Sequence, residues 1–409
     1  MHKKNLIVGQ SGGPTAVINS SLYGVVTEAY LHSDKIQNIY GMINGIEGFL
    51  NNNILNFDEL QENGTLKYLK YTPGAYLGSC RFKLPDSLED PIYAKIFNKF
   101  NEMNIGYFLY IGGNDSMDTV SKLSQYAHKI HSDIYFIGEP KTIDNDLIMT
   151  DHTPGYGSAA KYVATTVREI ICDSYVYNQN SVTIIEIMGR HTGWLTASSA
   201  LAKMKKDNHS LLIYLPEVNF SLTHFIQRVR EELRGHKHIT VCIAEGIHDN
   251  TGKFLCEHTS NTQIDNFGHK MLTGAGKYLE NYIRSHLNIK VRSIELNVNQ
   301  RCCAALMSAT DQQEAIMAGR FGVQMILKKQ TGKMIAFERD VLAEKYHIHY
   351  KLQDVTQICN KEKSFPVEWI SSDETDVTNE FIEYVRPLIQ GKIESPLDSS
   401  GLPDYILLT

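Results

Sequence analysis

The stretch "GEPKTIDNDL" concentrates side chains that could carry out phosphoryl-transfer chemistry. It contains Lys141, Asp144 and Asp146, and it follows an apolar run, "DIYFIG", that reads as a strand. One carboxylate could accept a hydroxyl proton while the other orients the hydroxyl or holds a metal, and the lysine adds a cation. Two carboxylates at i and i+2 of an extended segment would project to the same side. The same letters also make an ordinary polar turn.

A second segment, "LIVGQSGGPTAVINSS", reads as a strand, a Gly-rich turn and a helix. The backbone NH groups of Ser11, Gly12 and Gly13 could point into one concavity at a helix N-terminus, where an anion is favoured. Glycine matters there because a β-carbon would hold a phosphate off. A plain tight turn is the alternative. The segment is not a G-x-G-x-x-G fingerprint and has no Walker lysine, which argues against NAD and P-loop sites.

A third segment, "YFLYIGGNDSMDTV", repeats the order of strand, Gly-Gly and helix. Gly112 and Gly113 would let a phosphate approach, and Asn114 or Asp115 could reach Mg²⁺ directly or through water. Asp115 and Ser116 also fall where a helix N-cap is expected, so a purely structural role is open for either. Three strand ends of this kind in one domain favour a functional site over coincidence.

Arginines supply the complementary charge. They are Arg81, Arg190, Arg292 and Arg301. Scattered arginines are normally solvated surface residues, but Arg190 directly follows the apolar run "TIIEIMG". A forked donor at a strand end suits a phosphate or carboxylate on the substrate.

These side chains need elements that bring strand ends together. Short apolar runs recur, each followed by a loop and a helix-like stretch: "NLIVGQ", "NIYGMING", "IGYFLYIGG", "DIYFIGEP", "VTIIEIMG", "HITVCIAEG" and "VRSIELNV". The helical candidates are "AVINSSLYGVVTEAYLH", "SMDTVSKLSQYAHKI", "YGSAAKYVATTVREIICDSYV" and "SLTHFIQRVREELRG". Alternation of this kind predicts an α/β fold with parallel sheets and ligands at the carboxyl ends of the strands. After about Phe337 the periodicity is poor, and we expect that segment to pack on the body rather than form a third domain.

The composition fits a globular protein of two domains, since the chain has 409 residues, 42% of them apolar and 21% charged. A net charge of −6 gives the surface no electrostatic reason to seek nucleic acid. Seven cysteines without a regular framework indicate a reducing compartment. No signal peptide and no apolar run of roughly 20 residues is evident. The expected location is the cytoplasm, without a membrane partner.

Taken together, these residues resemble the phosphofructokinase family. The motifs "GQSGGPT.VIN", "LGSCRF", "IGGNDS", "KTIDND", "MGRHTGW", "AEG" and "NQR" occur in the family's order and approximate spacing, from about Leu6 to at least Arg320. One such motif would be a weak signal, whereas seven in order are specific.

The resemblance implies two Rossmann-like, three-layer αβα domains with mostly parallel sheets. The larger, residues 1–155 plus about 300–350, would hold the phosphoryl donor and Mg²⁺. The smaller, residues 156–299 plus about 351–409, would hold fructose 6-phosphate, with the active site in the cleft between them. The implied reaction transfers phosphoryl to the 1-hydroxyl of that sugar.

By matching motif, the resemblance makes Asp144 the general base on the 1-hydroxyl and Asp146 its support. Arg81 resembles the arginine on the transferring phosphate, and Lys141 and Asp115 complete the implied catalytic set. The implied donor-binding residues are Gly12, Gly13, Gly113 and Ser116.

The implied sugar-binding residues are Thr142, Ile143, Asp144, Met188, Gly189, Arg190, Glu245, Arg292 and Arg301. Arg292 looks like the arginine that reaches the 6-phosphate across a subunit interface. The resemblance therefore implies a homodimer or homotetramer with an intersubunit active site.

Two positions bear on the donor. Members that use ATP typically have "GGDGS" and a glycine before "TIDND", whereas this chain has Asp115 and Lys141. A carboxylate at position 115 would repel the α-phosphate of ATP. A lysine at position 141 would stabilise a small pyrophosphate leaving group. Both residues resemble the pyrophosphate-dependent branch, whose reaction is reversible and serves glycolysis and gluconeogenesis; an ATP-dependent kinase and a non-catalytic regulatory subunit are the alternatives.

The chain departs from the family pattern at several positions. Asn114 stands where a metal-binding aspartate is usual, so Mg²⁺ would be held by Asn114 or Asp115, partly through water. Ser181 stands where many members carry an intersubunit arginine, which weakens that part of the implied interface.

Overall fold

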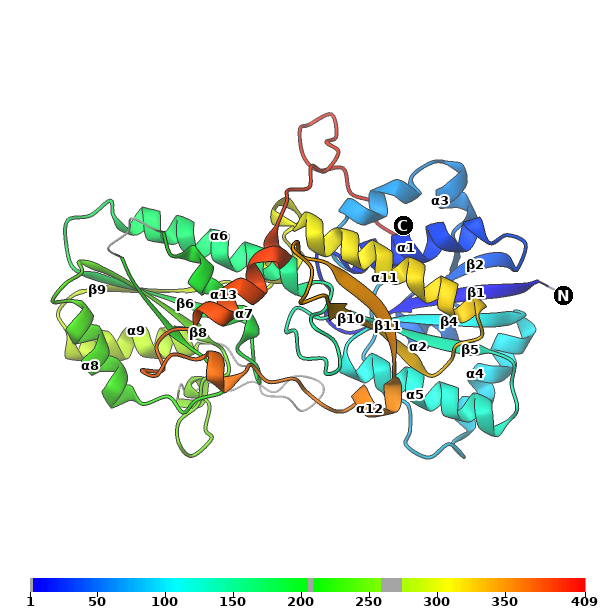
Figure 1. Ribbon diagram of the computed structural model, residues 1–409, viewed down its shortest axis with the longest axis horizontal. Coiled ribbons are helices and arrows are strands. Elements are labelled where there is room, and N and C mark those ends of the chain that lie inside the picture. Colours follow the sequence, from blue (N-terminus) through cyan, green and yellow to red (C-terminus); the bar gives the residue numbers. More distant parts are fainter. Residues whose placement is uncertain (1–2, 205–208, 259–273, 409) are drawn as a thin grey trace. The chain divides into compact units, whose positions relative to one another are not determined.

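The computed structural model describes residues 3–204, 209–258 and 274–408. The chain divides into two compact units (Figure 1). Unit 1 comprises Met1–Ser158, Arg301–Glu362 and Gln390–Thr409, and unit 2 comprises Ala159–Gln300 and Lys363–Ile389. Each unit has its own sheet and its own hydrophobic core.

The sheet of unit 1 has the strand order β11-β10-β5-β4-β1-β2-β3. Its strands are β1 (Lys4–Gln10), β2 (Ile36–Met42), β3 (Ile54–Asn56), β4 (Ile105–Gly112), β5 (Tyr135–Pro140), β10 (Lys333–Arg339) and β11 (Ile348–Asp354). The pairs β2–β3 and β10–β11 at the two edges are antiparallel, and the other pairs are parallel. Because the central strands are parallel, the carboxyl ends of β1, β4 and β5 lie at the same edge of the sheet.

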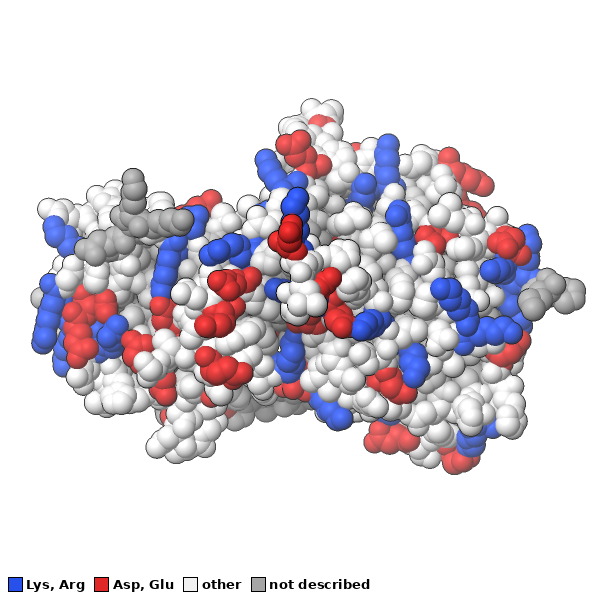
Figure 2. Space-filling model, in the orientation of Figure 1, with Lys and Arg blue, Asp and Glu red and all other residues white. Residues whose placement is uncertain are grey.

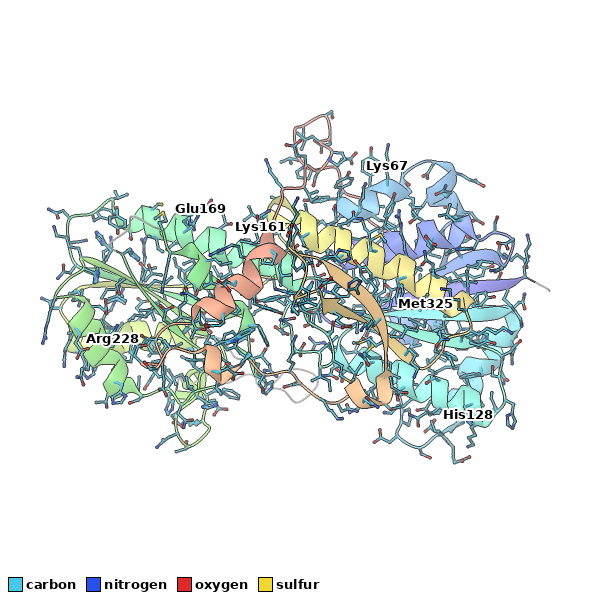
Figure 3. All side chains as sticks on the ribbon, viewed as in Figure 1. Lys67, His128, Lys161, Glu169, Arg228 and Met325 are labelled. Carbon is cyan, nitrogen blue, oxygen red and sulfur yellow. The ribbon has the colours of Figure 1, made fainter. Side chains whose placement is uncertain are left out.

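Helices cover both faces of this sheet. They are α1 (Ile18–Leu31), α2 (Gly45–Leu50), α3 (Asp58–Glu62), α4 (Pro91–Glu102), α5 (Asn114–Lys129), α11 (Ala309–Leu327) and α12 (Val355–Ile358), with short 3₁₀ turns at Leu66–Tyr71 and Ala304–Leu306. Figure 1 shows α1 and α11 on one face and α4 and α5 on the other. Successive residues of β1 point to opposite faces, so Leu6 and Val8 join the core under α1 and α11 while Ile7 joins the core under α4 and α5. Met325 of α11, labelled in Figure 3, packs against the first of these cores.

The contact between α1 and α11 depends on glycine. A β-carbon on Gly24 would lie 2.1 Å from the carbonyl oxygen of Ile316, and one on Gly319 would lie 2.3 Å from that of Ser21. Real β-carbons do not come this close to an oxygen, so the two helix backbones can approach only because both positions lack a side chain.

The sheet of unit 2 is wholly parallel, with the order β7-β8-β6-β9. Its strands are β6 (Ser181–Ile187), β7 (Ser210–Tyr214), β8 (His238–Ala244) and β9 (Lys290–Glu295). Its helices are α6 (Tyr156–Ser174), α7 (Trp194–Ala197), α8 (Leu222–Glu232), α9 (Ala275–His286) and α13 (Asn379–Val385), with 3₁₀ turns at Ser198–Ala202, Leu255–His258, Val367–Trp369 and Arg386–Ile389. The short α10 (Asn299–Cys302) lies at the boundary of the units. Apolar residues of α8 and α9 form the core on one face of the sheet, and Figure 1 shows α6 on the other.

The predicted α/β class with mostly parallel sheets is confirmed, and all seven predicted apolar runs are strands. The four predicted helices correspond to α1, α5, α6 and α8. The division into units differs from the expected one, because residues 351–362 and 390–409 belong to unit 1. Near the C-terminus, for example, the backbone NH of Ile406 donates to the hydroxyl of Thr72 at 3.1 Å. Within the described residues, no helix combines the length and hydropathy needed to cross a membrane.

Candidate active site

Three strand ends meet in unit 1. The parallel register pairs Gln10 of β1 with Ile111 of β4, and Gly112 of β4 with Pro140 of β5. The backbone NH of Lys141 donates to the carbonyl oxygen of Gly112 at 3.0 Å, which continues this pairing beyond the strands. The three segments singled out in the sequence therefore leave the sheet side by side.

Lys141 lies at the centre of this group. Its side chain is almost completely buried, at 3% exposure, and its Nζ donates to the carbonyl oxygen of Gly13 at 2.6 Å. The same Nζ lies 3.2 Å from the place that a β-carbon on Gly12 would occupy, and Gly12 has a φ of +78°. Burial lowers the pKa of Lys141 to about 8, although Asp144 and Asp146 nearby act in the opposite direction. A bound anion would offset the cost of burying this ammonium group.

A second cation, Arg301, approaches the same turn. Its Nη1 lies 3.6 Å from the place that a β-carbon on Gly13 would occupy, and its charge contributes to lowering the pKa of Lys141. The resemblance assigned Arg301 to the sugar. Within unit 1 it lies next to the Gly-rich turn, so two cations converge on Gly12 and Gly13.

The Gly-rich turn differs from the expectation in two respects. The backbone NH of Ser11 donates to the carbonyl oxygen of Ile111 at 3.0 Å, so it extends the sheet and does not join Gly12 and Gly13 in facing a ligand. In addition, α1 begins only at Ile18, and residues 14–17 separate the turn from the helix. The turn therefore does not lead directly into the first turn of α1. The cations of neighbouring segments supply the positive charge instead.

Arg81 belongs to a loop that lies against this turn. The hydroxyl of Ser79 donates to the carbonyl oxygen of Gly12 at 2.6 Å. The hydroxyl of Ser11 donates to the carbonyl oxygen of Cys80 at 3.3 Å. The Arg81 side chain is exposed and follows these two contacts directly in the chain. The loop thus carries an arginine to the edge of the sheet at which Lys141 lies.

The segment with the two aspartates is not extended. Asn145 has a φ of +55° and is completely buried, and the chain bends at Ile143 and Asp144. The alternation that was expected to put Asp144 and Asp146 on one side does not apply, because it requires a regular strand. Both carboxylates are nevertheless half-buried, and both act on the pKa of Lys141.

Hydrogen bonds close the base of this segment. The backbone NH of Thr142 donates to the carbonyl oxygen of Pro154 at 3.2 Å, and the hydroxyl of Thr153 donates to the carbonyl oxygen of Thr142 at 2.9 Å. The Thr142 hydroxyl in turn accepts from the backbone NH of Asp144 at 3.1 Å. Thr142, which is buried, therefore holds the shape of the segment, and Ile143 next to it in the chain is also buried.

A buried ionic network anchors the returning limb of the segment. The ring of His152 contacts Asp151 through Nδ1 at 2.7 Å and Glu314 through Nε2 at 2.8 Å. Two carboxylates can both accept from one imidazole only when both ring nitrogens carry protons. Burial alone would lower the pKa of His152, but Glu314 and Asp151 outweigh it and raise the pKa to about 9. Pattern reading missed this network because Glu314 lies 162 residues further along the chain.

Three further contacts lie around this network. Arg339 donates to Asp151 at 2.9 Å, and the hydroxyl of Tyr346 donates to Glu314 at 2.7 Å. The carboxylate of Asp311, one turn before Glu314 on α11, accepts from the backbone NH of Gly155 at 2.9 Å. The chain that follows the two aspartates is thus tied to α11 through two buried acids.

The first turn of α5 carries the candidate metal residues. The N-cap is Gly113 and the helix begins at Asn114, so Asp115 and Ser116 lie within the first turn rather than at the N-cap. Asn114 donates through Nδ2 to the carbonyl oxygen of Lys361 at 2.6 Å. Its Oδ1 is buried and has no hydrogen-bond partner among the described residues, whereas Asp115 is exposed.

This arrangement fits a Mg²⁺ ion held mainly by substrate. Within the described part of the chain, no group of three or more His, Cys, Asp or Glu side chains could hold a metal. In phosphoryl-transfer sites Mg²⁺ is usually bound by one or two carboxylates together with phosphate oxygens and water. The carboxylate of Asp115 and the unpartnered oxygen of Asn114 are the oxygen ligands that the first turn of α5 offers for such a partial shell.

In unit 2, four predicted sugar-binding residues meet at the ends of β6 and β8. Ile187 and Ala244, the last residues of these strands, are paired, so Met188, Gly189 and Arg190 emerge beside Glu245. The NH of Gly189 donates to Glu245 Oε1 at 3.4 Å. A β-carbon on Gly246 would lie 1.8 Å from the carbonyl oxygen of Arg190, so glycine is required for this close approach.

Arg292 does not join this group within the chain. It pairs with Thr183 in the middle of β9 and β6, and its Nε donates to the Thr183 hydroxyl at 3.3 Å. Its Nη2 contacts Asp173 at 2.8 Å, and both side chains are partly exposed. Ile187 is four residues beyond Thr183, which corresponds to about 13 Å along a strand.

Comparison with known proteins agrees with these features. The family model described as "Phosphofructokinase" matches residues 5–327. A pyrophosphate–fructose 6-phosphate 1-phosphotransferase of Methylococcus capsulatus is 36% identical, over 100% of this chain and 96% of that protein. A sulfofructose kinase of Alkalicoccus urumqiensis is 32% identical, over 97% and 99%.

Comparison with solved structures points to the same family. The crystal structure of a pyrophosphate-dependent phosphofructokinase from Nitrosospira multiformis superposes with a TM-score of 0.89 and 32% identity, and it covers 99% of this chain and 96% of that one. The resemblance inferred from the motifs is confirmed: this chain belongs to the phosphofructokinase family.

Proposed function

We propose that the protein catalyses the reversible, Mg²⁺-dependent transfer of phosphoryl from pyrophosphate to the 1-hydroxyl of fructose 6-phosphate. The products are fructose 1,6-bisphosphate and phosphate. The observation that carries the choice of donor is the buried Lys141 ammonium group, hydrogen-bonded to Gly13 in the Gly-rich turn. Full-length similarity to proteins named for this reaction supports the proposal.

The donor argument rests on charge and space. Lys141 and Arg301 bring two cations to Gly12 and Gly13 in a volume that glycine keeps free of side chains. Pyrophosphate is compact and highly charged, so buried cations stabilise it and the leaving phosphate strongly. Asp115, exposed in the first turn of α5, disfavours a donor with a further phosphate and a nucleoside at that place.

The transfer step needs a base and electrostatic stabilisation. In this proposal Asp144 accepts the proton of the 1-hydroxyl as the sugar oxygen attacks the phosphorus, and Asp146 supports it. Lys141 and Arg81 stabilise the charge on the transferring and leaving phosphate oxygens. Asn114 and Asp115 would hold Mg²⁺, which when bound neutralises part of the charge on the phosphate oxygens. Gly12, Gly13, Gly113 and Ser116 complete the donor site.

The sugar is bound by a second set of residues. In this proposal Met188, Gly189, Arg190 and Glu245, which unit 2 gathers at the ends of two strands, contact fructose 6-phosphate. Thr142, Ile143 and Arg301 contribute from unit 1. Arg292 contacts the 6-phosphate of sugar bound in a neighbouring subunit of a homodimer or homotetramer, and the enzyme works in the cytoplasm.

A donor assay tests the proposal. The purified protein is given fructose 6-phosphate and Mg²⁺ with either pyrophosphate or ATP, and fructose 1,6-bisphosphate is measured. We expect turnover with pyrophosphate and little with ATP. Turnover with ATP alone would replace the proposal by an ATP-dependent phosphofructokinase, and no turnover with either donor would indicate a non-catalytic regulatory subunit.

A further inference from the structure

A small hollow in unit 2 gathers hydroxyl groups and cations away from the ends of β6 and β8. Its polar lining residues are Ser174, Tyr177, Ser181, Thr183, Lys290 and Arg292. They come from the end of α6 and the loop after it, from β6 and from β9. None of the described residues that line the hollow is acidic. The Ser174 hydroxyl donates to the carbonyl oxygen of Ile171 at 2.6 Å, and the Ser181 hydroxyl is paired with His238 Nδ1 at 2.9 Å. The hollow itself is only water-sized, so the two cations at its rim are the groups that would attract an anion.

The strand register explains why the two cations act together. In the parallel pair β6–β9, Ser181 is opposite Lys290 and Thr183 is opposite Arg292. Residues i and i+2 of a strand point to the same face and are about 7 Å apart. Lys290 and Arg292 therefore share one face of β9, close enough for both long side chains to reach one phosphate group.

Both cations are held by contacts that a ligand can displace. Lys290 is exposed, and its Nζ lies 4.0 Å from the centre of the Tyr177 ring. Arg292 forms its ion pair with Asp173 at a partly exposed position. Exposed ion pairs of this kind contribute little free energy, so an anion can take the place of Asp173.

The position of Lys290 resolves one departure from the family pattern. Ser181 stands where many members carry an arginine, and Lys290 is its direct partner on the neighbouring strand. We propose that Lys290 supplies the second cation, beside Arg292, that binds the 6-phosphate of the sugar, and that this pair of charges selects phosphate over sulfonate. The proposal rests on the proposed function, in which Arg292 contacts that phosphate in a neighbouring subunit.

The selectivity follows from charge. A phosphate monoester has a second pKa of about 6 and is mainly a dianion at pH 7.5, whereas a sulfonate carries a single negative charge. Each cation near the group therefore attracts the phosphate more strongly than the sulfonate. The sulfofructose kinase relative is named for a sugar that carries a sulfonate, so the distinction between phosphate and sulfonate is relevant among similar proteins.

The substitution Lys290→Gln tests the proposal. With saturating pyrophosphate, kcat/KM is measured for fructose 6-phosphate and for 6-deoxy-6-sulfofructose. We expect kcat/KM for fructose 6-phosphate to fall about tenfold, mainly through KM, because one charge-assisted hydrogen bond is lost. The value for the sulfonate should fall less than about threefold, and KM for pyrophosphate should not change. The ratio of kcat/KM for fructose 6-phosphate to kcat/KM for the sulfonate therefore falls.

Three variants serve as controls. Lys290→Arg keeps the charge and should keep the wild-type ratio. Ser181→Arg combined with Lys290→Gln moves the cation to the opposite strand and should restore the ratio. Lys253→Gln removes an exposed lysine of unit 2 outside the hollow and should leave kcat/KM unchanged for both sugars. Thermal midpoints of all variants report whether a loss comes from unfolding.

An unchanged ratio in Lys290→Gln would overturn the proposal, as would an equal loss for both sugars or a loss that Lys290→Arg shares. These results leave the proposed function intact, because the wild-type enzyme still turns over fructose 6-phosphate. Absence of turnover in the wild type would instead remove the proposed function itself.

Discussion

The charged side chains of the two candidate regions differ in how deeply they are buried. In unit 1, Lys141 and His152 are 3% and 1% exposed, and each has partners within 3 Å. In unit 2, Arg190 and Arg292 are partly exposed and Lys290 is exposed. Figure 2 shows that Lys and Arg are interspersed with Asp and Glu on the face in view.

The difference indicates two ways of binding phosphate. A buried cation has lost its water and is held in place by neighbours, so it can stabilise a developing charge without reorganisation. An exposed cation exchanges partners easily and contributes affinity and selectivity instead. We therefore expect substitutions in unit 1 to affect turnover and stability strongly, and substitutions in unit 2 to affect mainly KM for the sugar.

The largest effect is expected for Asp144→Ala. Loss of the general base should lower kcat about 10²–10⁴-fold with little change in KM for either substrate. Steady-state kinetics measure both parameters, and Asp133→Ala, at an exposed position before β5, is the control. A wild-type kcat in the Asp144 variant would exclude it as the base.

The next effect concerns the donor. Asp115→Gly with Lys141→Gly removes the buried cation and the repelling carboxylate, so kcat/KM for pyrophosphate should fall about 10²–10³-fold. The ratio of ATP to pyrophosphate activity should rise. If the double variant loses both activities in proportion, these residues do not choose the donor.

The free energy of unfolding should fall much more when a buried acid is replaced than when an exposed one is. Glu314→Gln breaks a buried pair with His152, and it should lower the free energy of unfolding by about 3–5 kcal/mol. Glu89→Gln breaks a pair between the largely exposed side chains of Glu89 and Lys129 and should change it by less than about 1 kcal/mol. Urea unfolding measures both, and equal values would contradict the comparison.

The same network predicts a dependence on pH. The pKa of His152 is raised from 6.5 to about 9 in the folded protein, so its stabilising contribution is fully present below pH 6.5 and is lost as pH rises through 9. The groups facing it are Glu314, Asp151 and Tyr346, with Arg339 on Asp151. Thermal midpoints between pH 6 and 10 should fall more steeply in the wild type than in His152→Gln. Parallel curves would show that His152 is not a buried cation.

The smallest effect is expected in unit 2. Asp173→Asn removes the exposed partner of Arg292 and should change the free energy of unfolding by less than about 1 kcal/mol. KM for fructose 6-phosphate should fall slightly, because Arg292 no longer has to leave a carboxylate. A large rise in KM would mean that Asp173 positions Arg292 rather than competing with the phosphate.

The strands were predictable because buried parallel strands are continuous apolar runs, as in "YFLYIG" of β4 and "VTIIEI" of β6. The strand "SLLIY" of β7 was missed, since an apolar run of only four letters does not by itself distinguish a strand from a buried helix segment. The left-handed conformation of Asn145 was also missed. Asn adopts this conformation more readily than most residues, and the hydrogen bonds at Thr142 and Thr153 shape the chain around it.

The sequence by itself determined which chemical groups are present and in what order, and seven motifs in the family's order, among them those around Asp144 and Arg190, were sufficient to recognise the family. Only the tertiary structure decided the environment of each group. Lys141 became a buried ammonium beside Gly13, 128 residues away, and His152 became an imidazolium between two carboxylates. Lys290 came to lie opposite Ser181 through strand register. Burial and charge pairing depend on contacts between distant segments, and local sequence patterns do not encode those contacts.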